Sequence, residues 1–168
     1  STLDVAHALC EGNAPSGSLV LAERQTAGRG RGGHRWASAA GTGIWMTMIE
    51  RPTDPAAVEV LAIRLGMQAA AALDRFVDGM VRLKWPNDLY LGDGKLCGIL
   101  VETRWREQRI DWVAVGLGVN VRMPRDVPHA AALRDGTSRV RVLETLVRAV
   151  RGAAAARGAL RESELAEF

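Results

Sequence analysis

The stretch Glu23–Trp36 reads ERQTAGRGRGGHRW and combines four arginines, four glycines and one tryptophan. It follows an alternating apolar run, Ser18–Ala22, that predicts a β-strand. Glycine lets the backbone adopt positive φ and approach a ligand closely. Arginine presents a fixed fork of donors that matches carboxylate or phosphate oxygens. A strand that leads into such a loop predicts a lid over an anionic small molecule; the alternative is a solvated, flexible basic linker.

Length and composition predict one ordered globular domain. The chain has 168 residues, 48% of them hydrophobic, and a net charge of +3, which does not demand a nucleic-acid partner. Its apolar runs are shorter than the ~20 residues that span a bilayer, and no signal pattern is present. Cys10 and Cys97 lie far apart and predict reduced core thiols of a cytoplasmic protein, with one disulfide as the alternative. The three histidines have no metal-ligand spacing.

Hydrophobic periodicity and turn signals predict an α+β domain. The expected strands are Ser18–Glu23, Ile44–Ile49, Met80–Lys84, Leu89–Leu91, Leu96–Thr103 and Arg109–Val121. The expected helices are one capped by Thr2 and ended by Gly12, a long one from Asp54 and Pro55 to Phe76, one capped by Thr137 or Ser138, and a short one within 157–168. Tight turns imply antiparallel pairing, so we expect a mixed, largely antiparallel sheet with helices mainly on one side.

Two further segments carry candidate chemistry. In Arg82–Asp88, Lys84 ends a strand before a rigid proline turn, which suits a fixed positive charge on a reacting carboxylate or phosphate. The alternative is a surface lysine beside a packed tryptophan. In Gly116–Val121, the amide of Asn120 suits the edge of an adenine or a local turn, and strand glycines mark a bulge or a close approach. Glu102 is expected to bind a metal or, more often, to pair with an arginine.

Other motifs are absent or weak. The dipeptide Gly94-Lys95 is not a P-loop, because Leu96 stands where Ser or Thr is required. No GxSxG or HExxH sequence occurs. Arg29–Gly33 also matches an RNA-binding RGG patch, but a single copy between ordered strands is a weak signal.

Taken together, the segments resemble the catalytic domain of the biotin protein ligases. The matching pieces, in chain order, are Ser1-Thr2, Gln25–Gly32 with Trp36, Lys84–Asp88, Lys95–Glu102 and Gly116–Val121. The resemblance implies the biotin–lipoate ligase catalytic fold, which is similar to class II aminoacyl-tRNA synthetases. It implies that residues 1–168 are the catalytic domain. These residues contain neither a DNA-binding domain nor the small β-rich C-terminal domain of the family, and we expect them to be part of a longer protein.

The resemblance also implies an activity. Enzymes of this family use ATP and Mg²⁺ to convert biotin to biotinyl-5′-AMP, and they pass the biotinyl group to a lysine of a biotin carboxyl carrier protein domain. It therefore implies a cytoplasmic ligase, monomeric or homodimeric, with no DNA or membrane partner. Alternatives are a lipoate- or octanoate-type acyl-protein ligase or transferase, a nucleic-acid-binding module using the Arg/Gly loop, and a binding domain without catalysis.

The resemblance assigns the site residue by residue. It implies biotin contacts from Ser1, Thr2, Gln25, Gly28, Arg29, Gly30, Arg31 and Lys84. It implies nucleotide contacts from Arg31, Trp36 and Asn120. Lys84 is expected to be the catalytic lysine, Arg31 to grip the phosphate, and most of Lys95–Glu102 to be scaffold. It assigns no metal ligand. Gly33 and His34 replace more basic residues that the family often carries in the loop.

Overall fold

The computed structural model describes residues 1–166 and contains one six-stranded sheet with the order β1-β2-β6-β5-β4-β3. The strands are β1 (Leu19–Ala22), β2 (Gly43–Glu50), β3 (Val81–Lys84), β4 (Asp88–Leu91), β5 (Gly94–Arg106) and β6 (Arg109–Asn120). The helices are α1 (Thr2–Glu11), α2 (Pro55–Glu59), α3 (Leu61–Leu73), α4 (Arg139–Ala155) and α5 (Glu162–Leu165), with short 3-10 turns η1 (Arg31–Gly33) and η2 (Asp74–Phe76). Of the tail predicted to hold a short helix, residues 167–168 lie outside the described part.

The sheet confirms the predicted α+β class. Each pair of neighbouring strands is antiparallel. Parallel pairing in residues 1–166 is limited to one isolated bridge, between Lys95 and Ala130. The sheet is therefore more uniformly antiparallel than the predicted mixed sheet, because tight turns connect β3 to β4, β4 to β5 and β5 to β6.

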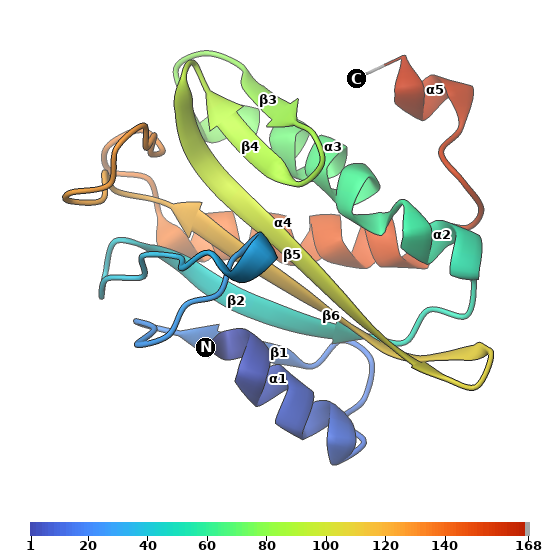
Figure 1. Cartoon of the computed structure of the whole chain (residues 1–168). Helices are drawn as coiled ribbons and strands as arrows, with labels where there is room; N and C mark the ends of the chain where they lie inside the picture. Colours follow the sequence, from blue (N-terminus) through green and yellow to red (C-terminus); the bar gives the residue numbers. More distant parts are fainter. Residues whose placement is uncertain (167–168) are drawn as a thin grey trace.

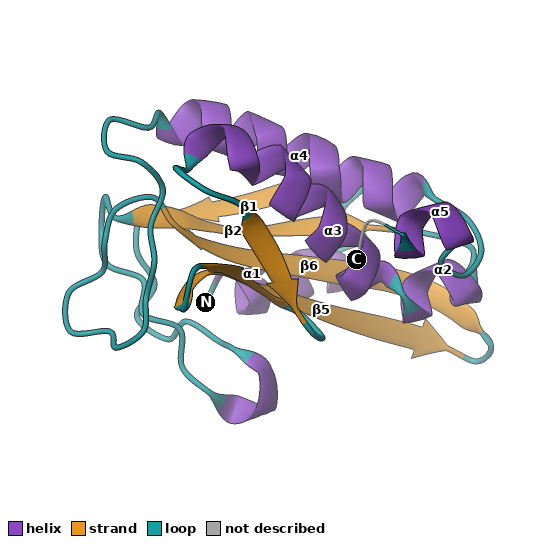
Figure 2. Cartoon of the chain, turned by 90° about the horizontal axis from the view of Figure 1, so that it is seen from above, coloured by secondary structure: helices purple, strands orange, loops and turns teal. Residues whose placement is uncertain are grey.

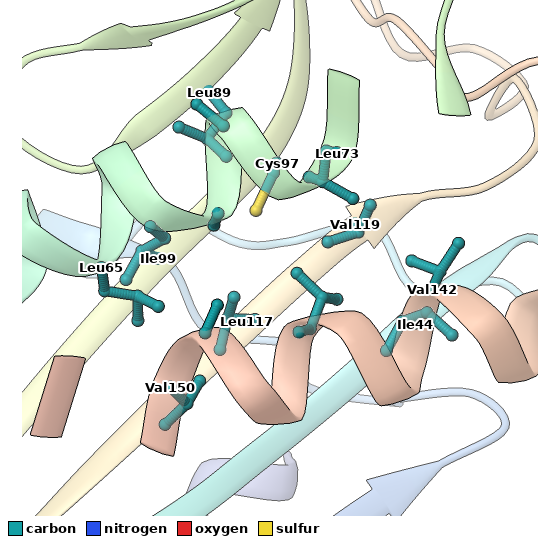
Figure 3. Close-up of a cluster of buried hydrophobic side chains, with 14 of the residues drawn as sticks. Ile44, Leu65, Leu73, Leu89, Cys97, Ile99, Leu117, Val119, Val142 and Val150 are labelled. Carbon is teal, nitrogen blue, oxygen red and sulfur yellow. The ribbon is translucent and has the colours of Figure 1, made fainter. Parts of the chain in front are cut away.

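Helices cover the two faces of the sheet unequally. Helices α3 and α4 pack side by side on one face, and α1 lies on the other (Figures 1 and 2). Alternation along β6 divides its side chains: Val115 and Leu117 enter the large core under α3 and α4, whereas Trp112 and Ala114 enter a smaller core under α1. Figure 3 shows the large core, where Leu65 of α3 and other buried side chains meet the strands. Each fully buried aliphatic side chain contributes roughly 1.5–3 kcal/mol.

Most helix ends lie where the capping residues of the sequence predicted them. Ser138 caps α4 and accepts a hydrogen bond from the Arg141 backbone, as predicted. The predicted long helix 54–76 is wrong in two respects: the chain breaks at Val60 into α2 and α3, and α3 ends at Leu73, before the 3-10 turn η2. The first helix is capped by Ser1 rather than by Thr2. Thr2 thereby becomes the first helical residue and is buried.

Both cysteines are buried and free. This confirms the prediction of reduced core thiols over the disulfide alternative. Burial raises the pKa of each thiol, so neither is poised as a nucleophile. Within residues 1–166, no helix has the length and apolar character needed to cross a membrane.

Candidate functional site

A cavity of about 540 Å³ opens on the sheet face that carries α1. Beneath α1, this face presents Ile49 from β2 and Ala114 from β6, which are buried in the smaller core. Further along the same strands and on the same face, Thr47, Gly116 and Gly118 line the cavity. The first turn of α1 and the loop 25–36 close its sides, and that loop, blue in Figure 1, lies in front of the sheet. Small residues where no helix covers the sheet create the space.

A chain of polar side chains lies at the α1 end of the cavity. Thr47 Oγ1 donates to Thr2 Oγ1 (2.9 Å), and both the backbone nitrogen and Oγ1 of Thr2 donate to Gln25 Oε1 (2.8 and 3.2 Å). Gln25 Nε2 in turn donates to Ser38 Oγ (2.8 Å). These bonds fix the orientation of the Gln25 amide, with one Nε2 hydrogen left for a ligand. Ser1, Thr2 and Gln25 thus meet at one wall, whereas Thr47 and Ser38 were not predicted.

The Gly/Arg loop folds into a short finger. Arg29 pairs with Arg35 in an isolated bridge, and Gly30 donates its backbone N–H to His34 (2.7 Å). Gly32 has φ of 65°, the left-handed conformation that glycine adopts without strain. Arg29, Gly30 and Arg31 line the cavity, as predicted. The ordered finger argues against the flexible-linker reading.

Gly28 has a different role from the predicted biotin contact. It does not line the main cavity. A Cβ at this position would lie 2.3 Å from the Trp36 carbonyl oxygen, so only glycine allows the two strands of the finger to close. Gly28 shapes the loop rather than contacting the cavity.

Trp36 lies across the sheet at the glycines of β5 and β6. Gly98 and Gly118 are paired across these strands, and a Cβ on either would come within 2.9 and 2.4 Å of the indole. The strand glycines were predicted to mark a bulge or a close approach, and the close approach is confirmed at Gly118, where the approaching group is Trp36. Its Nε1 is buried without a hydrogen-bond partner in residues 1–166, and its ring packs edge-on against Trp45.

Lys95 is the lysine that lines the cavity. Its Nζ lies 2.7 Å from Asp88 Oδ2 and 5.1 Å from the centre of the Trp36 ring. Its backbone N–H donates to His129 (2.7 Å), and its carbonyl accepts from Ala131 (2.9 Å). The ammonium of Lys95 is held by Asp88 and its backbone by His129 and Ala131. A cation fixed in this way beside an aromatic ring can stabilise a developing negative charge. Neither Lys95 nor Asp88 was predicted as a site residue.

The structure does not place Lys84, the predicted catalytic lysine, in this cavity. The side chain is exposed and does not line the cavity. Its Nζ instead lies 4.7 Å from the centre of the Tyr90 ring. The alternative, a surface lysine beside a packed tryptophan, agrees with the exposure of Lys84, but the ring beside it is Tyr90, and Trp85 is itself exposed. The same motif contributes Pro86, Asn87 and Asp88 to the cavity.

Asn120 does not line the cavity either. It is buried, and its Nδ2 donates to the carbonyls of Lys95 (3.2 Å) and Ala131 (3.0 Å). The amide nitrogen therefore serves the backbone that carries Lys95, and the predicted adenine contact is not a feature of this geometry. This strand asparagine thus satisfies its amide on backbone carbonyls beside the cavity.

Glu102 pairs with an arginine, as favoured from the sequence. Arg29 donates to Glu102 Oε1 (2.6 Å) and to Asp4 Oδ1 (2.9 Å). No group of three His, Cys, Asp or Glu side chains in residues 1–166 could hold a metal ion. Among the described side chains that line the cavity, Asp88 is the one carboxylate, and Asn87 adds a carboxamide oxygen.

Fold and site together define an α+β small-molecule-binding domain with polar recognition at one wall and fixed cations at the other. The chain belongs to the biotin/lipoate A/B protein ligase family, whose model matches residues 2–120.

Curated relatives are named as ligases. The chain is 39% identical over 136 residues to the bifunctional ligase/repressor BirA of Bacillus subtilis, covering 76% of this chain and 40% of the relative. It is 38% identical over 130 residues to the biotin–[acetyl-CoA-carboxylase] ligase of Paracoccus denitrificans, covering 73% and 51%. The chain thus spans about two fifths to half the length of these relatives.

Solved structures share the fold. The biotin protein ligase of Aquifex aeolicus in complex with biotin and ATP superposes with a TM-score of 0.73 at 28% identity, covering 92% of this chain and 66% of that one. The biotin protein ligase of Leishmania major in complex with biotinyl-5-AMP gives 0.81 at 22% identity, covering 100% and 76%. At 22% identity, the similarity to the Leishmania major structure shows the fold alone.

Proposed function

We propose that this chain is the catalytic domain of an ATP-dependent biotin protein ligase, which forms biotinyl-5′-AMP and transfers biotin to a lysine of a carrier protein. The observation that carries the proposal is one cavity that joins the Thr2–Gln25 polar wall to Arg31 and Lys95. The relatives named for biotin ligation, and the Aquifex aeolicus complex with biotin and ATP, support biotin and ATP as the substrates.

The polar wall suits the ring system of the acid. Thr2 and Gln25 hold each other in fixed orientations, so they bind a polar heterocycle with little further loss of side-chain entropy. The apolar side chains of Leu3 and Leu100 line the same cavity. A ligand with a polar ring at one end, an apolar chain and a terminal carboxylate matches this order.

The cations suit the first chemical step. One carboxylate oxygen of biotin attacks the α-phosphorus of ATP, the bond to the β-phosphate oxygen breaks, and pyrophosphate leaves. Both reactants are anions, so the positive charges must bring them together and stabilise the charge that accumulates at phosphorus. We assign the catalytic role to Lys95, which is held by Asp88, in place of Lys84, to which the family resemblance assigned it. Arg31 lines the same cavity from the finger and suits the grip on the phosphate.

The second step needs an enclosed intermediate. The uncharged ε-amine of the acceptor lysine attacks the acyl carbon, the bond to the phosphate oxygen breaks, and AMP leaves with the electron pair. Trp36 and the finger would shield the adenylate from water until the acceptor arrives. The indole N–H of Trp36, buried and without a partner in residues 1–166, is available to a ligand acceptor.

Magnesium fits the cavity as a companion of ATP. Mg²⁺ prefers oxygen ligands and is commonly held by one or two protein oxygens together with substrate phosphates and water. Asp88 and Asn87 would supply the protein oxygens. When bound, the ion would neutralise part of the triphosphate charge.

The other functions fit less well. A lipoate- or octanoate-type enzyme shares the family and the cavity, but those acids have no polar ring to engage the ordered Thr2–Gln25 wall. A nucleic-acid-binding loop needs arginines free for phosphates, whereas Arg29 is paired with Asp4 and Glu102. A domain that binds without catalysis has the same cavity, so product formation must distinguish it.

Mass spectrometry of the purified chain with ATP and Mg²⁺ tests the proposal. Biotin, lipoate and octanoate are supplied in parallel reactions. We expect an acyl-adenylate and pyrophosphate in the reaction with biotin and in neither of the reactions with lipoate and octanoate. An adenylate from lipoate or octanoate in preference to biotin would support the alternative ligase. Biotin binding without any adenylate would support the non-catalytic domain.

A further inference from the structure

Arg29, at the base of the finger, is held by carboxylates from two separate elements. Its Nη1 lies 2.9 Å from Asp4 on α1, and its Nη2 lies 2.6 Å from Glu102 on β5. These residues are 25 and 73 positions away in the chain. The finger is therefore attached to both the helix and the sheet that border the cavity.

The other oxygen of Glu102 lies beside His7. His7 Nε2 lies 2.8 Å from Glu102 Oε2, and the His7 ring packs against Trp112 with 4.9 Å between ring centres. The Glu102 side chain is 27% exposed. His7 thus borders the second oxygen of Glu102 without a hydrogen bond to it, and Arg29 is the side chain that donates to this carboxylate.

The attachment acts at a point that controls the rest of the finger. Arg29 pairs with Arg35, and the Trp36 backbone N–H donates to Gly28 (3.0 Å). Holding Arg29 therefore holds both strands of the finger and, beyond them, Trp36. The finger contains four glycines. A segment so rich in glycine gains much backbone entropy when released, so contacts outside it decide how often it opens.

We propose that Glu102, together with Asp4, is a positioning residue that keeps the Gly/Arg finger closed over the acyl-adenylate by holding Arg29. The inference deepens the proposed function and rests on it for the identity of the retained intermediate. Neither Glu102 nor Asp4 lines the main cavity. Glu102 instead lines a second hollow of about 420 Å³, between the finger and β5. Its effect on the reaction is through Arg29 and not through the reacting atoms.

Trypsin sensitivity tests the closure without any ligand. Trypsin cleaves after arginine, and the finger presents Arg29, Arg31 and Arg35 to it. We expect Glu102→Gln to speed cleavage in the finger roughly two- to fivefold, the range for loss of one exposed ion pair, because cleavage follows the population of the open form. Asp78→Asn is the matched control, since it removes the Arg134–Asp78 ion pair (2.8 Å) far from the cavity.

Release of the intermediate tests the consequence. Wild type and each variant are loaded with biotinyl-5′-AMP, and the dissociation rate of the adenylate is measured. We expect the rate for Glu102→Gln to exceed that of wild type by a similar factor, and the rate for Glu102→Asp to lie between the two. The rate of adenylate formation per bound substrate is expected to change less than the release rate. Asp4→Asn combined with Glu102→Gln removes both carboxylate charges, and we expect it to exceed either single change.

The outcomes separate the inference from the function. Cleavage and release rates equal to wild type in the double variant would overturn the inference. So would cleavage that rises equally at arginines outside the finger, since that would reflect general loosening. If the wild-type chain forms no adenylate with any acid, the proposed function fails, and the trypsin comparison alone then decides whether Glu102 holds the finger.

Discussion

Replacing Lys95 tests the assignment of the catalytic cation most sharply, because Lys84 offers a matched control. Lys95 Nζ lies within the cavity, 2.7 Å from Asp88. Lys84 Nζ is outside it, above the Tyr90 ring. Lys84 ends β3 and Lys95 lies near the start of β5, on either side of β4, and both changes to alanine remove one positive charge. Only the position relative to the cavity differs.

The magnitude follows from where the charge acts. Removing one preorganised donor from a reacting centre costs roughly 10²–10³ in rate. Lys95→Ala also leaves Asp88 unpaired in the cavity, where its negative charge repels two anionic substrates. We therefore expect adenylate formation to fall by at least about 10²-fold.

The cost to folding is expected to be small by comparison. The Lys95 side chain is 32% exposed, so its ion pair contributes about 0.2–1 kcal/mol to stability. Single-turnover formation of the adenylate at saturating biotin and ATP measures the effect, with thermal unfolding as the check on folding. Lys84→Ala is expected to stay within about fivefold of wild type. A large loss in Lys84→Ala with a mild loss in Lys95→Ala would refute the assignment.

Three further changes test separate parts of the site and the fold. Arg31→Ala is expected to release biotinyl-5′-AMP into solution faster, because the finger would lose its cation at the phosphate; unchanged retention in a filter assay would contradict this role. Gly118→Ala places a Cβ 2.4 Å from Trp36 Nε1, so we expect the indole to move and nucleotide affinity to fall, measured by calorimetry. Hydrogen bonds from the Arg64 side chain lower the pKa of Glu164 to about 2, below the ordinary value of 4.5. This contribution to stability is therefore present above pH ~4.5 and lost as the pH falls toward 2. We expect the unfolding midpoint of Glu164→Gln to change less with pH across that interval than the midpoint of wild type.

The strands were predictable because their signals are local. Alternation placed β1, β2 and β6 within one or two residues of their ends. The helix break at Val60 was not predictable, because the apolar periodicity of residues 54–76 continues through it. Assignment of α1 to the opposite face of the sheet depends on packing between distant segments. The sequence pattern alone does not encode it.

The site was partly predictable for the same reason. The Gly/Arg loop, Thr2 and Gln25 lie where the motifs indicated. The choice between Lys84 and Lys95 required knowledge of which way each side chain points. The pairing of β4 with β5 shifts register between Leu89 and Tyr90, and such an irregularity redirects side chains without any sign in the residue types. Asn120 shows the converse case, an unusual residue whose partner is the backbone of Lys95.

A crystal structure of the chain bound to a non-hydrolysable biotinyl-5′-adenylate analogue tests the central claim most directly. The cavity predicts the ring system against Thr2 and Gln25, and the phosphate within about 3.2 Å of Lys95 Nζ, a hydrogen-bonding distance. A ligand whose phosphate lies beside Lys84, or one bound outside the cavity, would contradict the account.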